Sequence, residues 1–125
     1  MSSEPGALKT AWAEIQPYVT KDGSEIRELM HPAVHPARNQ SLAEATVLPG
    51  RETRLHRHRR TEEIYHVTGG KGLMRLGEAR FEVCAGDTVL IPPGTAHSVR
   101  NTGASPLKIL CACAPAYAHE DTELL

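Results

Sequence analysis

From Ser41 onward, hydrophobic and polar residues alternate in short runs that are separated by turn signals. The runs read SLAEATVL, EIYHV, KGLMRL, ARFEVC, TVLI, HSVRN and LKILCAC, with turns such as Pro49-Gly50 and TGASP at 102–106 between them. Alternation places every second side chain on one face of a strand, and turn signals about every 8–12 residues are typical of all-β sandwiches and barrels. Because no long stretch has the period of roughly 3.6 residues of an amphipathic helix, the pattern predicts an all-β fold.

The segments on either side of these runs are less regular. KDG at 21–23 indicates a turn within an otherwise ambiguous N-terminal stretch. We expect residues 1–40 to form an N-terminal arm and the first strand or strands, which pack on the barrel. Residues 41–114 are expected to form the barrel core, and residues 115–125 a short C-terminal tail.

The tail is polar after Pro115. We expect it to be exposed or to pack on the surface of the barrel. The alternative is that it folds back across an opening of the barrel, and three tail residues would then help to line that opening: His119, Glu120 and Asp121.

Length and charge narrow the class of protein. A chain of 125 residues is the size of one ordinary domain with one modest core. Fourteen basic and 15 acidic side chains give a net charge of −1, which argues against a nucleic-acid-binding protein. We expect most members of an arginine cluster to be solvated, and the alternative is that one or two face a pocket and attract an anionic substrate. The cluster consists of Arg51, Arg54, Arg57, Arg59 and Arg60.

The sequence indicates neither a membrane protein nor an oxidising compartment. Its three cysteines lack the spacing of a disulfide framework, and its N-terminus does not resemble a signal peptide. The most apolar segment, ILCACAPAYA, is far shorter than the ~20 residues that span a bilayer. We therefore expect a soluble, cytoplasmic protein. Cys111 and Cys113 share one strand face and are expected to be buried as small hydrophobes, the alternative being thiols close to a metal.

Candidate metal ligands are concentrated in LHRHRRTEEIYHV, residues 55–67. His56 and His58 lie two apart, so on a strand both imidazoles project from the same face. Two adjacent imidazoles suit a divalent transition metal, and a nearby carboxylate would add a third ligand. His97 follows the rigid turn PPGTA and is well placed to be a further ligand.

Two spaced motifs in this region resemble those of the cupin superfamily. The first family motif is Gly, five residues, His-x-His, three or four residues, Glu, six residues and Gly; the second is Gly, five residues, Pro-x-Gly, two residues, His, three residues and Asn. The matching residues are Gly50, His56, His58, Glu63, Gly70, Gly86, Pro92, Gly94, His97 and Asn101. Only residues 71–85 separate the two motifs, which is typical of a small single-domain member.

The resemblance implies a jelly-roll β-barrel that carries a metal in its interior. It implies His56, His58, Glu63 and His97 as ligands of one divalent transition metal. Fe, Mn, Ni, Zn and Cu all suit such donors, and the sequence does not select among them. It also implies a homodimer, since many cupins are dimers.

Glu62 fits the first motif as well as Glu63 does. Strand alternation separates the two cases: if Glu63 points inward, so does Tyr65, whereas His66 points outward. EEIYHV resembles the common cupin sequence EEIYYV, in which the second Glu is the ligand, so we assign Glu63 as the ligand.

The resemblance leaves three hypotheses for function, all with a small organic molecule as the partner. The leading one is a dioxygenase-type enzyme, in which substrate and dioxygen take two open positions on the metal, and the other two are its alternatives. The second is a non-redox lyase or isomerase in which Tyr65 is the catalytic base, the alternative for Tyr65 being a part of the pocket wall. The third is a non-catalytic binding protein.

Overall fold

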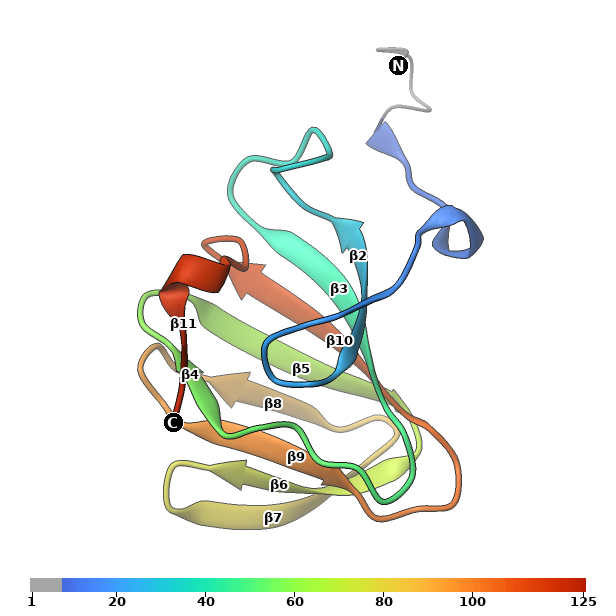
Figure 1. Cartoon of the computed structure of the whole chain (residues 1–125), viewed down its shortest axis with the longest axis vertical. Helices are drawn as coiled ribbons and strands as arrows, with labels where there is room; N and C mark the ends of the chain where they lie inside the picture. Colours follow the sequence, from blue (N-terminus) through green and yellow to red (C-terminus); the bar gives the residue numbers. More distant parts are fainter. Residues whose placement is uncertain (1–7) are drawn as a thin grey trace.

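Two antiparallel β-sheets pack around one core in the computed structural model, which describes residues 8–125 (Figure 1). The six-stranded sheet contains, in spatial order, β1 (Tyr18–Val19), β2 (Glu25–Met30), β3 (Ser41–Val47), β10 (Leu107–Ala114), β5 (Glu62–Gly69) and β8 (Thr88–Ile91). The five-stranded sheet contains β11 (Thr122–Leu124), β4 (His56–His58), β9 (His97–Asn101), β6 (Lys71–Leu76) and β7 (Ala79–Cys84). Short 3₁₀ helices form at η2 (Trp12–Glu14) and η3 (His119–Asp121). The expected all-β jelly roll is confirmed.

Strict alternation along the two central strands produces the core. On β5, Tyr65 and Val67 are buried between more exposed neighbours, and β10 buries Ile109 and Cys111 in the same way. The two strands are antiparallel neighbours, with Cys111 opposite Tyr65. Burial of these side chains stabilises the fold, and the same alternation determines which polar residues face the interior.

Two glycines of the motifs hold turns that position the site. Gly70 has φ 80° and Gly94 has φ 78°, a left-handed conformation that residues with a side chain rarely adopt. A Cβ atom on Gly70 would also lie 2.7 Å from the carbonyl oxygen of Pro106. The amide of Gly94 donates to the carbonyl of His58 at 2.6 Å, which ties the turn before β9 to the end of β4.

The motif residue Asn101 has a structural role. Its side-chain amide donates to the carbonyls of Val47 and Ser105, each at 2.8 Å, and its side-chain oxygen accepts from the amide of Gly103 at 2.8 Å. These contacts hold the loop before β10 against the end of β3.

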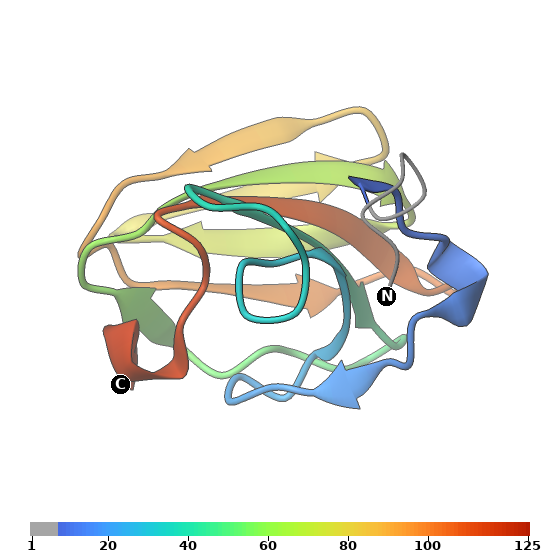
Figure 2. The ribbon, with the colours of Figure 1, turned by 90° about the horizontal axis from the view of Figure 1, so that it is seen from above.

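The turn between β1 and β2 lies on the same side of the barrel as the C-terminal segment (Figure 2). Lys21, in the turn between β1 and β2, donates from Nζ to the carbonyls of His119 and Thr122, each at 2.9 Å. β11 pairs with β4, with Thr122 opposite His58. The tail therefore packs on the barrel. The alternative placed His119, Glu120 and Asp121 at an opening of the barrel, and none of these three lines the cavity described below.

Candidate metal centre

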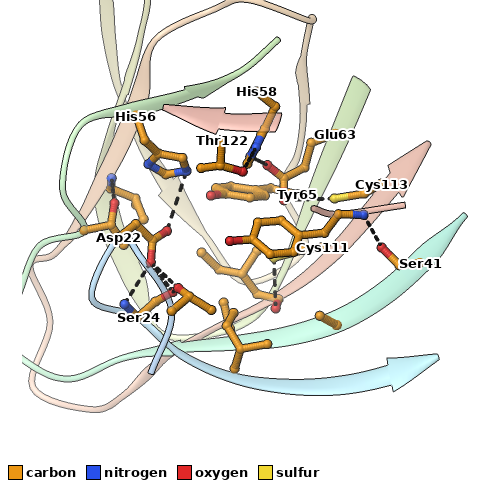
Figure 3. A pocket seen from close by; sticks show the side chains of 18 of the residues that line it. Asp22, Ser24, Ser41, His56, His58, Glu63, Tyr65, Cys111, Cys113 and Thr122 are labelled. Atoms are coloured by element: carbon orange, nitrogen blue, oxygen red, sulfur yellow. Dashed lines mark hydrogen bonds and ion pairs between the residues drawn. The ribbon is translucent and has the colours of Figure 1, made fainter. Parts of the chain in front are cut away.

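Three histidines and one glutamate lie together inside the barrel, where His56, His58 and Glu63 line a cavity (Figure 3). β4 supplies His56 and His58, β9 supplies His97, and β5 supplies Glu63 from the other sheet. One nitrogen from each imidazole lies within 4.8 Å of the other two. All four residues are buried, and His97 is 0% exposed. The structure thus brings together the four side chains that the sequence predicted as ligands.

Backbone carbonyls fix the orientation of two of the imidazoles. His56 Nδ1 lies 2.8 Å from the carbonyl oxygen of Arg54, and His97 Nδ1 lies 3.0 Å from that of Thr95. A carbonyl only accepts, so Nδ1 carries the proton in both rings and the lone pair of each neutral ring is on Nε2.

A hydroxyl fixes the third imidazole in the same tautomer. His58 Nδ1 lies 2.9 Å from Oγ1 of Thr122, and that hydroxyl donates its own proton to the carbonyl of Ala118 at 2.9 Å. The oxygen of Thr122 is therefore free to accept from Nδ1–H of His58. All three Nε2 atoms thus point to the interior. In the metal-free protein a proton between Nε2 of His58 and Glu63 accounts for their contact, and a bound metal would take the place of that proton.

Glu63 supplies the negative charge. Its Oε1 lies 3.1 Å from Nε2 of His58 and 3.5 Å from Nε2 of His97, and its Oε2 accepts from Sγ of Cys113 at 3.4 Å. Burial acts to raise the pKa of Glu63, but its interactions with His58 and His97 outweigh burial and lower that pKa to about 2. Glu63 is thus a carboxylate at neutral pH.

Two observations show that these donors fit a divalent metal. Among the residues that the structure describes, buried Nε2 of His97 has no hydrogen-bond partner, and a metal ion would satisfy its lone pair. Burial, followed by the neighbouring His97, lowers the pKa of His56, so this ring stays neutral and available as a ligand. Three neutral nitrogens and one carboxylate suit a first-row transition metal.

Alternation along β5 separates the two candidate glutamates. Glu63 is 5% exposed and faces the cavity, whereas Glu62 is exposed to solvent. His66 points away from the cavity, and its Nδ1 lies 2.8 Å from Oγ1 of Thr88. Glu63 is therefore the glutamate that can reach a metal.

Tyr65 lines the cavity beside the histidines. Its ring centroid lies 5.9 Å from that of His97. Burial and then the charge of Glu63 raise the pKa of Tyr65 well above its usual value. The phenol therefore carries its proton, and its role in catalysis stays a prediction.

Other hydrophobic side chains of these strands divide between the cavity wall and the protein surface. Val99, Cys111 and Cys113 line the cavity, whereas Leu90 points outward and is 52% exposed. Burial is the largest cause of the raised pKa of both Cys111 and Cys113, so both are neutral thiols.

The arginine cluster does not reach the cavity. Arg57 and Arg59 instead form ion pairs with Glu123 at 2.8 Å. Within residues 8–125, no Lys or Arg lines the cavity, which agrees with the expectation of solvated arginines.

Sequence reasoning missed most polar residues of the cavity wall, among them Asp22, Tyr117 and Thr122. Asp22 was recognised only as part of a turn, although its Oδ2 lies 3.6 Å from Nε2 of His56. Tyr117 and Thr122 belong to the tail, where His119, Glu120 and Asp121 had been considered instead. Their spacing follows no periodic pattern, so only the folded chain reveals their proximity. The cavity measures about 40 Å³, more than the ~10–15 Å³ that one water needs.

Comparisons with known proteins agree with the fold. A family profile described as "Cupin domain" matches residues 43–113. Protein MJ1618 of Methanocaldococcus jannaschii, whose name describes it as uncharacterized, is 54% identical over 118 residues, which cover 94% of each chain.

Two solved structures share the fold at low sequence identity. Pac13 of Streptomyces, a nucleoside dehydratase, gives a TM-score of 0.77 at 18% identity and covers 94% of this chain and 89% of its own. Oxalate decarboxylase of Lactobacillus farciminis, in a formate complex, gives a TM-score of 0.77 at 24% identity. The match covers 90% of this chain and 34% of the decarboxylase chain. In the part of the chain that the structure describes, no helix is both long and apolar enough to cross a bilayer.

Proposed function

The chain belongs to the cupin family, and on that premise we propose that it is an enzyme that transforms a small organic molecule at a divalent metal held by His56, His58, Glu63 and His97. The observation that carries this proposal is the convergence of three oriented Nε2 lone pairs and one carboxylate in a buried cavity. When bound, the metal supplies Lewis-acid and template chemistry.

The chain's own residues contribute orientation and charge. The carbonyls of Arg54 and Thr95 hold His56 and His97 in the tautomer that faces the cavity. The carboxylate of Glu63 compensates one of the two charges of a divalent ion. Burial excludes bulk water, which strengthens every electrostatic interaction inside the cavity.

We propose a non-redox lyase or isomerase as the reaction class. The phenol of Tyr65, a group that can move a proton, lines the cavity together with three of the predicted ligands: His56, His58 and Glu63. Proton transfer by positioned groups is the central need of elimination and isomerisation reactions. Similarity of fold to a dehydratase and a decarboxylase is consistent with this class, and by itself it supports the fold alone.

A dioxygenase is the second candidate. Small apolar side chains from β3 and β10 form another part of the cavity wall, among them Ala43, Ala45, Val47 and Ile109. An apolar wall next to a metal would shelter a hydrophobic substrate and dioxygen from water.

The charges around the cavity indicate the class of substrate. Glu28 and Asp22 add two carboxylates to that of Glu63, and among the described lining residues no Lys or Arg is present to pair with an anion. Proteins usually recognise substrate carboxylates with Arg or Lys. We therefore propose a neutral, hydroxyl-bearing or cationic substrate.

The test is a substrate screen on protein loaded separately with Mn²⁺, Fe²⁺ or Zn²⁺. Mixtures of nucleosides, polyols and amino alcohols are incubated with and without dioxygen, and substrate loss is followed by proton NMR. The proposal predicts equal turnover in both atmospheres and loss of turnover in Tyr65→Phe. Turnover that consumes dioxygen would identify the second candidate, and binding without turnover would leave a non-catalytic protein.

We also propose a homodimer formed through the outer face of the six-stranded sheet. Leu42, Ala112, Ile64 and Leu90 lie side by side on four neighbouring strands, and three of them are exposed large hydrophobics. Light scattering measures the mass. The proposal predicts a dimer for the wild type and a monomer for Leu90→Lys, and a monomeric wild type would refute it.

A further inference from the structure

The carboxylate of Asp22 faces the histidine cluster from the turn between β1 and β2. Its Oδ2 lies 3.6 Å from Nε2 of His56, and the side chains are only 13% and 3% exposed, respectively. Figure 3 shows the carboxylate pointing from the turn toward this imidazole.

The turn fixes the direction of this carboxylate. Oδ1 accepts from Oγ1 of Thr20 at 2.7 Å, from the amide of Ser24 at 2.9 Å and from Oγ of Ser24 at 2.6 Å. The carbonyl of Asp22 accepts from the amide of Arg54 at 2.8 Å, which ties the turn to the segment before β4. One carboxylate oxygen is therefore occupied within the turn, and the other is directed at His56.

The two facing atoms are both acceptors. Since His56 Nδ1 donates to Arg54, Nε2 of the neutral ring offers only a lone pair, and Oδ2 of Asp22 likewise only accepts. Their separation of 3.6 Å is too long for a hydrogen bond. Two donor atoms bound to one ion at about 2.0–2.2 Å lie no more than roughly 4.4 Å apart. A cation beside His56 would satisfy both atoms at the observed spacing, although Asp22 lies outside the group of three histidine nitrogens that are within 4.8 Å of one another.

We propose that Asp22 is a fifth donor of the metal centre, supplied by the N-terminal hairpin. This inference rests on the proposed function, because it adds a ligand to the same ion. Two carboxylates would balance the charge of a divalent ion. A second oxygen donor would also make the site bind harder ions such as Mn²⁺ more readily. If all five residues held the ion, one position of a six-coordinate ion would remain, which would suit a substrate bound through one atom better than substrate and dioxygen together.

The test is a calorimetric titration of metal-free protein with Mn²⁺. It compares the wild type, Asp22→Asn and Glu28→Gln. Glu28 is a matched control because its carboxylate lines the same cavity but accepts from the hydroxyl of Tyr18. We expect Asp22→Asn to bind Mn²⁺ at least 10-fold more weakly and to change the EPR spectrum of the bound ion. Glu28→Gln is expected to stay within about 2-fold of the wild type and to keep its spectrum.

Two outcomes overturn the inference. If Asp22→Asn binds Mn²⁺ as tightly as the wild type with the same EPR spectrum, Asp22 is not a ligand, and the proposed function stands. If the wild type binds neither Mn²⁺ nor Zn²⁺, the inference and the proposed function fail together. Asn retains an acceptor for Thr20 and Ser24, and thermal melting of the metal-free variants checks folding. Asp22→Ser serves as a second variant, since its short side chain cannot reach the ion.

Discussion

The two sets of polar groups around the cavity come from different parts of the chain. The predicted ligands His56, His58, Glu63 and His97 lie on strands between residues 50 and 101, at the spacings of two motifs. Their polar neighbours come from the chain ends, with Asp22 on the N-terminal hairpin and Thr122, for example, on the C-terminal strand. The motif set carries the four predicted donors, whereas the terminal set orients one of them through Thr122 and, as proposed above, adds a fifth donor through Asp22.

This difference shows that the two motifs alone do not complete the site. The imidazoles of His56 and His97 take their orientation from carbonyls two residues earlier in the chain. His58 instead depends on a hydroxyl 64 residues away. A short piece of sequence can therefore define a ligand without defining the partner that holds it in place.

Replacing Thr122 by Val gives the largest effect expected from the terminal set apart from Asp22. The change removes the acceptor for Nδ1–H of His58 and leaves the ring free to turn. We expect the affinity for Zn²⁺ to fall about 10- to 100-fold, the usual cost of losing such a partner. Competition with a chromogenic chelator measures the affinity.

A similar pair on the outside of the barrel is the control for Thr122→Val. His66 Nδ1 lies 2.8 Å from Oγ1 of Thr88, and this contact is exposed. Thr88→Val is therefore expected to leave the affinity for Zn²⁺ unchanged. Equal losses in the two variants would contradict a specific role of Thr122.

Gly70→Ala tests whether a motif position serves shape rather than chemistry. A Cβ atom there would meet Pro106 and would force a side chain into the left-handed region. We expect a loss of about 1–3 kcal/mol in the free energy of unfolding, measured with urea. Gly69→Ala is the control, because its Cβ would meet only ordinary contacts at 3.8 Å. If both variants are equally stable, the turn does not require glycine.

The smallest effect expected is a change in the acid stability of the metal-free protein. The pKa of Glu63 is about 2 in the fold and 4.5 in the reference state, so the folded protein binds fewer protons between these values. The contribution of Glu63 to stability is therefore complete above pH 4.5 and is lost as the pH falls toward 2. Thermal melting over this range should show a steeper loss for the wild type than for Glu63→Gln. Exposed Glu62→Gln should follow the wild type, and parallel curves for all three would contradict the lowered pKa.

The sequence predicted the barrel and the proximity of the four motif side chains because both follow from local rules. Alternation along β5 determines that Glu63, rather than Glu62, faces the interior. The fixed spacing of the histidines matches the motifs of the cupin fold. Asp22 and Thr122 could not be predicted in this way. Their positions depend on strand pairing across the whole chain, such as that of Thr122 with His58, and no period in the sequence encodes that pairing.

The most direct test of the central claim is elemental analysis of untagged protein purified without added metal, beside His97→Ala. Nε2 of His97 is buried without a hydrogen-bond partner in the described chain, so it should bind metal strongly. The account predicts about one transition-metal ion per wild-type chain and almost none in the variant. His66→Ala, altered on the outer face, should retain the metal. A wild type that contains no metal and takes up none on titration would contradict the account.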